Sequence, residues 1–323
     1  MIKTSSTFAV LFGGLIAASV AQAQLPVSRR AAIVPVPLSA NSTTSVGIPF
    51  IQEPVARDLV TGVSGNTITG AGAYTPGAYA TGYQLLIVTG PGRGTGLPIS
   101  NNTASDFTVV GPVPALTANS DEFELVSFNT LASVFGNPPT TLTGGSSAAA
   151  ADKVVIGSSQ YFYKTSGAAS PGWKLTTAPN GGNVSTTVPI PNLAGVNIIR
   201  VGAATDVAVR GVARSTRAVV PIPTGTSLVS WPFTGNVMLL ESGLQNSILG
   251  ASSAAGADKV VIGGTQYFYK TSGANSPGWK TTTLPNAAAP GANNVVLNPS
   301  GKAFNIIRAG AATSHPVLES FAP

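Results

Sequence analysis

The fold of this chain is decided by a stretch of 35 residues that occurs twice. The first copy, Ser146–Asn180, reads SSAAAADKVVIGSSQYFYKTSGAASPGWKLTTAPN. The second copy, Ser252–Asn286, reads SSAAGADKVVIGGTQYFYKTSGANSPGWKTTTLPN. The two copies are identical at 29 of the 35 aligned positions. Self-similarity of this kind indicates two related structural units in tandem.

The duplication extends to both sides of this stretch. Asn197–Arg200 matches Asn305–Arg308 downstream, and Arg30–Pro37 resembles Arg217–Pro223 upstream. The first copy also holds a large extra stretch. We therefore divide the chain into a signal peptide (1–23), an extended N-terminal arm (24–41), a first β module (42–214, with an insertion at about 70–118) and a second β module (215–323).

The residue pattern inside the repeat favours strands. Lys153–Ile156 is an apolar run that Gly157 closes, and Gln160–Lys164 follows after a short turn, which is the pattern of a β-hairpin. No segment has helical apolar periodicity over three turns. The sequence predicts an all-β fold of two tandem related β-sandwich- or barrel-like modules, with an extended N-terminal arm and few short helical turns.

Composition limits the function classes. The chain has 323 residues, no cysteine and one histidine, and only 9% of its residues are charged, with a formal net charge of +6. Disulfides, thiolate metal sites, thiol catalysis and multi-histidine metal cages are therefore excluded. An ordinary soluble domain has about 25% charged residues, so the surface is unusually poor in charge.

The N-terminus has the three parts of a secretory signal. Lys3 precedes an apolar run, and Ala21-Gln22-Ala23 has the small-x-small pattern of a cleavage site. We expect a secreted, extracellular or cell-surface protein that does not span a membrane. After the cleavage site, the segment 24–40 could add as a strand to a neighbouring subunit; the alternative is a disordered tail. The apolar residues of this candidate assembly arm are Ile33, Val34, Val36 and Leu38.

Aromatic residues give each module a candidate binding strip. Two interpretations are open: a flat strip on one face of a sheet could stack on sugar rings, or the aromatics could fill the core. The residues of the strip are Tyr161, Tyr163 and Trp173 in the first copy, and Tyr267, Tyr269 and Trp279 in the second.

Other patterns give no catalytic, cofactor or metal site. The glycine-rich run Gly90–Gly96 lacks the Lys-Ser/Thr and the helix of a phosphate loop, so we expect a loop between strands. Glu122 and Glu124 could bind Ca²⁺ or act as an acid–base pair, or lie on an exposed strand face. The arginines between the modules form either a basic contact patch or a solvated linker; they are Arg210, Arg214 and Arg217.

Several of these motifs resemble an uncharacterised family of secreted bacterial β-rich repeat proteins. They are Ser45–Phe50, Asn129–Phe135, Ala151–Ile156, Tyr161–Tyr163, Gly172-Trp173 and Asn197–Arg200. The resemblance covers most of the chain after the signal and implies export and β structure. It implies no activity and assigns no functional residue.

Low charge favours a structural role. Surfaces with few charges suit broad repeated contacts in which little charge is desolvated. We therefore expect a subunit that self-assembles into an extracellular filament, tube or surface layer, as a homo-oligomer or polymer and not as an enzyme. The alternative is a carbohydrate-binding surface protein that uses the aromatic strips to bind a glycan. An unrecognised hydrolase ranks last, and we expect no cofactor and no nucleic-acid partner.

Overall fold

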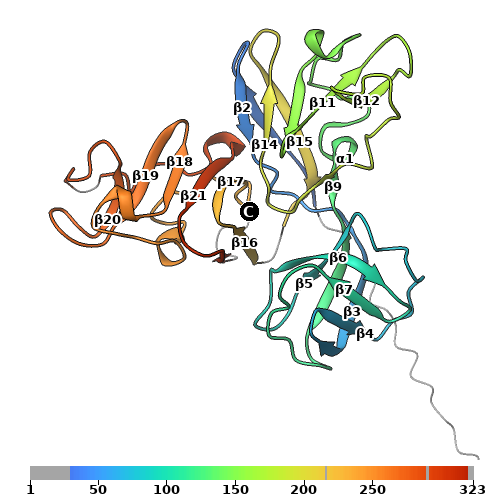
Figure 1. Ribbon diagram of the computed structural model, residues 1–323, viewed down its shortest axis with the longest axis horizontal. Coiled ribbons are helices and arrows are strands. Elements are labelled where there is room, and N and C mark those ends of the chain that lie inside the picture. Colours follow the sequence, from blue (N-terminus) through green and yellow to red (C-terminus); the bar gives the residue numbers. More distant parts are fainter. Residues whose placement is uncertain (1–29, 215–216, 289–290, 319–323) are drawn as a thin grey trace, which may run out of the picture.

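The fold is all-β and consists of three lobes that extend from a common centre (Figure 1). The computed structural model describes residues 30–214, 217–288 and 291–318. Module 1 is built from residues 31–51 and 129–212, a closed barrel from residues 54–127, and module 2 from residues 217–318. Within these described residues there is one short α-helix, α1, and a few single turns of 3₁₀ helix. The predicted all-β fold of two related modules is confirmed.

Module 1 contains a five-stranded antiparallel sheet with the strand order β12-β11-β10-β14-β2. The pairs β1–β15 and β9–β13 complete the module. Its elements are β1 (Ala31–Leu38), β2 (Thr43–Val46), β9 (Asn129–Thr130), α1 (Leu131–Phe135), η1 (Ala148–Ala150), β10 (Lys153–Ile156), β11 (Ser159–Lys164), β12 (Gly172–Leu175), β13 (Pro189–Ile190), β14 (Val196–Ile199) and β15 (Thr205–Val212).

Module 2 repeats this sheet with the strand order β17-β21-β18-β19-β20, beside the pair β16–β22. The registers agree as well, since Tyr163 pairs with Trp173 in module 1 and Tyr269 pairs with Trp279 in module 2. The elements are β16 (Ala218–Ile222), β17 (Gly225–Val229), η2 (Leu244–Asn246), η3 (Ala254–Gly256), β18 (Lys259–Ile262), β19 (Thr265–Lys270), β20 (Gly278–Thr281), η4 (Pro299–Gly301), β21 (Phe304–Arg308) and β22 (Thr313–Val317).

The central hairpin of each module forms because glycine opens its two-residue turn. Gly157 and Gly263 follow the first strand, with φ angles of 59° and 56°. Tight hairpin turns require a positive φ at this position, which glycine adopts without a steric penalty. The paired residues that flank the two turns, Ile156–Ser159 and Ile262–Thr265, are therefore in identical register.

The extra stretch of the first copy is a separate closed barrel with the strand order β3-β4-β7-β6-β5-β8. It is inserted between β2 and β9 and extends from 54 to 127, beyond the expected limits of about 70–118. The difference arises because the flanking strands β3 and β8 pair with each other and help to close the barrel, which removes free edges. The strands are β3 (Pro54–Ser64), β4 (Thr67–Gly70), β5 (Tyr83–Ile87), β6 (Gly96–Asn102), β7 (Asp106–Val109) and β8 (Glu122–Ser127).

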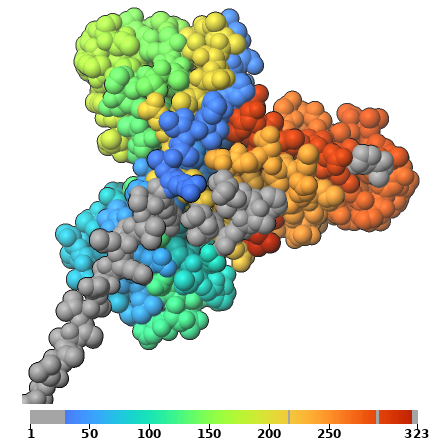
Figure 2. Space-filling model, turned by 180° about the vertical axis from the view of Figure 1, so that it is seen from behind, coloured from blue at the N-terminus to red at the C-terminus, as the bar shows by residue number. Residues whose placement is uncertain are grey.

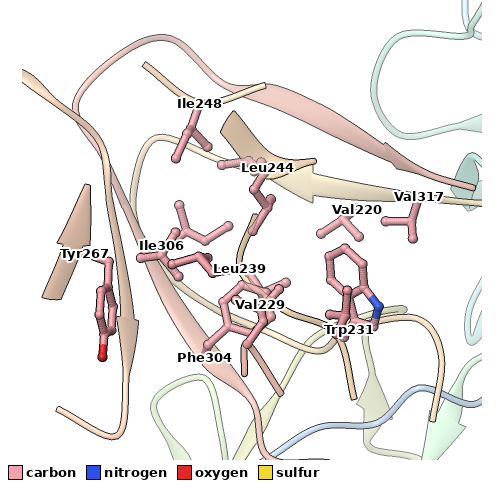
Figure 3. Packing of buried hydrophobic residues seen from close by; sticks show 14 of the residues in the cluster. Val220, Val229, Trp231, Leu239, Leu244, Ile248, Tyr267, Phe304, Ile306 and Val317 are labelled. Carbon is pink, nitrogen blue, oxygen red and sulfur yellow. The ribbon is translucent and has the colours of Figure 1, made fainter. Parts of the chain in front are cut away.

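Each lobe has its own hydrophobic core. In the barrel, Phe107 and Phe123 lie inside with ring centroids 5.6 Å apart. In module 2, Trp231 lies beside Val220 with Val317 nearby, and Phe304 lies beside Val229 (Figure 3). A smaller fourth cluster joins the barrel to module 1, so these two lobes also pack against each other.

The candidate assembly arm is paired within its own chain. Strand β1 forms an antiparallel ladder with β15 along its full length, and Val36 and Leu38 are buried in the core of module 1. Ile33 remains 63% exposed. Because this strand already has a partner and contributes to a core, the interpretation of an arm available to a neighbour is corrected for Ile33, Val34, Val36 and Leu38. Residues 24–29 of the arm lie outside the described residues.

Candidate functional site

The two modules meet through backbone groups of their edge strands, β2 and β17. The amide of Gly47 donates to the carbonyl oxygen of Gly301 (2.9 Å), and the amide of Ala303 donates to that of Ser45 (3.1 Å). These two bonds connect β2 of module 1 to the segment that leads into β21 of module 2.

A second pair of bonds connects the reverse elements. The amide of Ser230 donates to the carbonyl oxygen of Leu193 (2.8 Å), and the amide of Gly195 donates to that of Leu228 (3.0 Å). Here the segment after β17 of module 2 contacts the segment that leads into β14 of module 1.

The two pairs of bonds are the same contact made twice. Asn197 pairs with Ser45 in module 1, and its counterpart Asn305 pairs with Leu228 in module 2, so Ser45 and Leu228 are equivalent positions. By the same register, every donor and acceptor of the first pair of bonds corresponds to one of the second pair with the modules exchanged. The contact therefore has the pattern of an isologous, two-fold interface, formed inside one chain.

Small residues lie where the backbones approach most closely. A Cβ atom on Gly47 would lie 3.0 Å from Oγ of Ser230, and a Cβ atom on Gly195 would lie 2.6 Å from Cβ of Ala303. Ser230 is the counterpart of Gly47, and Ala303 is the counterpart of Gly195. Residues that contact their own counterparts lie close to the two-fold axis, where close approach requires small side chains.

One pair of equivalent positions differs in size. Leu193 is buried in the core of module 2, although it belongs to the chain segment of module 1. Its counterpart is Gly301, where a Cβ atom would lie 2.9 Å from Val34 and 3.1 Å from Val36 of β1. Module 1 thus inserts a leucine into the core of module 2. At the equivalent position module 2 has a glycine, which leaves room for strand β1 of module 1.

The outer edges of the two sheets are occupied by loops of their own module. Trp173 of β12 donates its amide to Oδ1 of Asn183 (3.2 Å), and the amide of Val184 donates to the Trp173 carbonyl. Trp279 of β20 makes the equivalent bond with Asn293 (3.0 Å). Because these loops cover the edges, the sheets are protected from adding further strands there.

The candidate aromatic strips lie mainly in the cores. Trp173 and Trp279 are fully buried, Tyr163 and Tyr267 are 7% and 8% exposed, and Tyr161 and Tyr269 pack against the core clusters. The core interpretation therefore replaces the sugar-binding interpretation for these six residues. On β11 the opposite side is buried as well, at Phe162 and Lys164.

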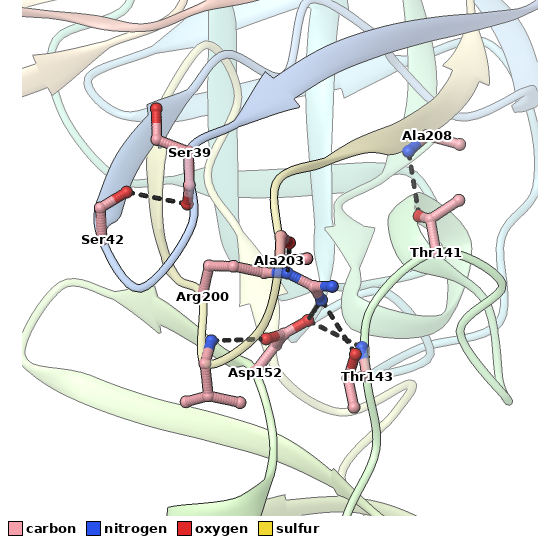
Figure 4. Close-up of polar contacts among 9 residues, drawn as sticks. Ser39, Ser42, Thr141, Thr143, Asp152, Arg200, Ala203 and Ala208 are labelled. Atoms are coloured by element: carbon pink, nitrogen blue, oxygen red, sulfur yellow. Dashed lines mark hydrogen bonds and ion pairs between the residues drawn. The ribbon is translucent and has the colours of Figure 1, made fainter.

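A buried ion pair holds the same loop in each module. Asp152 is fully buried and accepts hydrogen bonds from Arg200, from the amide of Thr143 (2.7 Å) and from the amide of Val201 (3.0 Å), as Figure 4 illustrates. In module 2 the corresponding carboxylate contacts Arg308 and the amides of Leu249 and Ala309; it belongs to Asp258. A carboxylate with this many donors has its hydrogen-bonding capacity satisfied, and it holds the loops that supply the donors in place.

Buried lysines are the polar feature that the sequence analysis did not single out. Nζ of Lys164 donates to the carbonyl of Ala168 (2.7 Å) and to Oδ1 of Asn180 (2.6 Å). The alternation that directs Phe162 inward also directs Lys164 inward, and this is the signal that could have revealed it. The equivalent side chain in module 2 is Lys270, which contacts Ala274, Pro285 and Asn286.

The remaining candidate residues are the paired glutamates of β8 and the arginines between the modules. Glu122 pairs with Arg57 and its side chain is 35% exposed, whereas Glu124 is only 3% exposed, so the interpretation of an exposed strand face is corrected for Glu124. Within residues 30–214, 217–288 and 291–318, no three His, Asp or Glu side chains gather closely enough to hold a metal ion. Arg214 is buried and donates to Oδ1 of Asn192, and Arg210 donates to Thr140, so a solvated linker does not describe them.

Comparison with known proteins assigns no family to the chain, and its class is given by the fold. It is an all-β chain of two tandem modules and an inserted barrel. No protein-family model matches it, and the searches against curated proteins and solved structures give no match either. The family resemblance of its motifs therefore stays a prediction. Among the described residues, no helix has the length and apolar character needed to cross a bilayer.

Proposed function

We propose that this protein is an exported structural subunit that assembles with copies of itself into an extracellular filament, tube or surface layer. The observation that carries the proposal is the contact between the modules. Two related folding units already associate in one chain through a two-fold contact made of backbone hydrogen bonds, with small side chains where the backbones approach most closely. No charged pair is needed to hold it, so little desolvation penalty opposes it.

The low content of charge supports further association. With 9% charged residues, the surface has little of the electrostatic repulsion that keeps ordinary proteins apart. Its exposed large apolar side chains are distributed unequally among the lobes. Module 2 has Met238, Leu240, Leu249, Leu284 and Leu318, the barrel has Val55, Val63 and Val110, and module 1 has Ile33.

This unequal distribution favours contacts between unlike surfaces. The two-fold contact is already used within the chain, and such a contact closes on itself. Growth of a polymer therefore requires a second, head-to-tail contact, which joins different faces of successive subunits and can continue without closing. The three-lobed outline seen in Figure 2 leaves module 2 and the barrel as separate projecting ends for such a contact.

Strand addition by the N-terminus is confined to a shorter segment in this proposal. Residues 31–38 are paired with β15, so this proposal assigns strand addition to the part between the predicted cleavage site and Arg30. This part, like the signal peptide at 1–23 that carries the proposed export, lies outside the described residues.

Negative-stain electron microscopy tests the proposal. The chain without residues 1–23 should form filaments, tubes or sheets as its concentration rises. A variant with Leu249→Lys and Leu284→Lys should form fewer or shorter assemblies, because these side chains are 48% and 65% exposed on module 2. The control is Thr176→Lys, a like charge on module 1. Single particles of one chain at every concentration would refute the proposal.

A further inference from the structure

A cavity of ≈ 300 Å³ lies at strand β9, where the barrel joins module 1 (Figure 1). Its volume is near the lower end of the range for ligand pockets, about 300–1,000 Å³, so it has room for a molecule of about one ring. Both lobes supply its wall, which includes Gln52, Tyr83, Ser127, Phe128, Thr130 and Thr187.

Backbone bonds hold the barrel side of the cavity. Tyr83 of β5 pairs with Ser127 of β8. The amide of the next residue, Phe128, donates to the carbonyl oxygen of Gly82 (2.8 Å). The ring of Tyr83 also packs edge-on against that of Tyr79, with the centroids 5.1 Å apart. The two aromatic residues of the wall therefore have fixed backbones, and the ring of Tyr83 has a neighbour that supports it.

A capping box holds the side that belongs to module 1. Oγ1 of Thr130 accepts from the amide of Ser133 (3.2 Å), and Oγ of Ser133 accepts from the amide of Thr130 (2.8 Å). The backbone of Thr130 also pairs with Pro189 of β13. Because Oγ1 of Thr130 is the acceptor in its bond, the hydroxyl proton of Thr130 can be donated to a ligand.

Polar groups without a protein partner face this site. Nε2 of Gln52 donates to Oδ1 of Asn129 (2.6 Å), which orients the amide and leaves Oε1 of Gln52 with no donor among the described residues. The hydroxyl groups of Tyr83, Ser127 and Thr187 likewise make no hydrogen bond within the described part of the chain. Hydroxyl groups both donate and accept, so the wall offers both kinds of partner to a ligand.

The absence of charge limits the kind of ligand. The described residues that line the cavity include no Asp, Glu, Lys, Arg or His. A charged ligand would lose water there without gaining a counter-charge, which is costly. A neutral molecule with many hydroxyl groups avoids this cost. Its polar edge can bond to the hydroxyl and amide groups, and its apolar face can lie on the rings of Tyr83 and Phe128.

We propose that this cavity is a binding site for one neutral sugar ring, a hexose. The site is distinct from the aromatic strips, whose residues lie mainly in the cores of the two modules. It is also independent of the proposed assembly. The sugar has two sources with the same chemistry, because it can be a free monosaccharide or the terminal unit of a longer glycan.

Ligand-observed NMR titration of the full chain provides the test. The probes are D-glucose, D-galactose and D-mannose, and the methyl α-glycoside of each. We expect saturable binding of at least one probe. Ser127→Ala should weaken this binding about two- to tenfold, the effect of losing one neutral hydrogen bond. Phe128→Ala should also weaken it, because the apolar face of the sugar loses a ring.

A pair of matched variants separates a filled cavity from a general effect. Thr187→Trp places a large side chain at the wall and should abolish binding. Thr177→Trp is the control, since Thr177 is also an exposed threonine in a turn of module 1 but does not line the cavity. Circular dichroism establishes that each variant retains the fold. Ser127→Ala, which removes a single oxygen atom, decides the matter if Thr187→Trp does not fold.

Each outcome decides the proposal. Loss of binding in Thr187→Trp but not in Thr177→Trp supports it. A methyl glycoside that binds as tightly as its free sugar assigns the site to the end of a glycan, and binding of the free sugar alone assigns it to a monosaccharide. Absence of saturable binding by all the probes, or an equal loss in the two tryptophan variants, overturns the proposal. Tighter binding of D-glucuronate than of every neutral probe overturns it as well.

Discussion

Modules 1 and 2 share a sheet of the same strand order and register, yet the chain segment that follows the first strand of the sheet differs greatly in size between them. After β2, module 1 accommodates a complete barrel before the chain returns at β9; after β17, module 2 continues directly through loops to β18. The sheet, the buried ion pair and the buried lysine are present in both. The repeated sequence thus specifies the same sheet in both modules, and the connection outside it tolerates a large insertion.

The second difference between the modules lies at their contact. Equivalent positions there are Gly47 and Ser230, or Leu193 and Gly301, although the backbone bonds are the same. Side chains have therefore diverged where the two modules face each other, while the hydrogen-bond pattern has not. The contact behaves as a two-fold interface whose halves have become specialised within one chain.

The largest losses of stability should follow from removing the carboxylates of the buried ion pairs. Asp152→Ala and Asp258→Ala should each lower the free energy of unfolding by about 3–5 kcal/mol, because each leaves a buried arginine and several amides without an acceptor. Asp206→Ala, at an exposed carboxylate, should change it by less than about 0.5 kcal/mol. Denaturant titration measures all three, and a large effect in only one module would break the equivalence of the two.

A single added methyl group should weaken the contact between the modules. In Gly47→Ala the new Cβ atom would lie 2.9 Å from the Gly301 carbonyl oxygen, a backbone atom that cannot easily move. We expect a loss of about 1–3 kcal/mol and faster hydrogen exchange at the amides of Ser230 and Ala303. Gly235→Ala, where no atom lies within 4 Å of the new Cβ, is the control. Unchanged exchange in Gly47→Ala would show that the contact is looser than described.

The equivalent tryptophans of β12 and β20 should differ in how much their replacement destabilises the protein. Nε1 of Trp173 donates to the carbonyl of Gly136 (2.8 Å), whereas Nε1 of Trp279 is buried with no acceptor among the described residues. Trp173→Phe should therefore destabilise the protein by about 1 kcal/mol more than Trp279→Phe. Equal losses in the two variants, measured by denaturant titration, would contradict this difference.

The smallest effect should be a pH dependence confined to module 2. Burial lowers the pKa of His315 below its usual value of 6.5, outweighing the hydrogen bond to the Ser242 carbonyl. The unfolded chain therefore takes up a proton first as the pH falls. Stability from this group is complete above pH 6.5 and is lost as the pH falls below it toward the lowered pKa, by at most about 1.4 kcal/mol per pH unit.

The counterpart of His315 in module 1 is Val207, which is fully buried and does not titrate. His315→Gln should remove the difference in the free energy of unfolding just above and just below pH 6.5. Hydrogen exchange resolved by peptide should locate the effect in module 2. A change of equal size in module 1 would show that another group is responsible.

The sequence predicted the parts of the fold that depend on local pattern. Repeated glycines after Ile156 and Ile262 revealed the hairpins, and the duplicated stretch revealed two modules. It could not reveal the contact between them, because backbone groups make the bonds and the side chains differ. It misplaced the limits of the barrel, since β3 and β8 pair only once the barrel closes.

For the candidate sites, too, the sequence could not reveal features that depend on contacts between distant parts of the chain. Alternation placed Tyr161 and Tyr163 on one face of a strand but could not tell that Phe162 and Lys164 on its other face are buried as well. The apolar run around Val36 indicated an extended strand, although its partner, β15, is distant in the sequence. The cavity between the barrel and module 1 could not be foreseen, because it depends on how these two lobes are placed.

Sedimentation velocity tests the central claim most directly. The chain without residues 1–23 is measured over a wide range of concentration, at the ionic strength of its medium. If a surface with so little charge serves self-assembly, the sedimentation coefficient should rise with concentration into species larger than a dimer. A single boundary at the mass of one chain, unchanged at every concentration, would contradict the account.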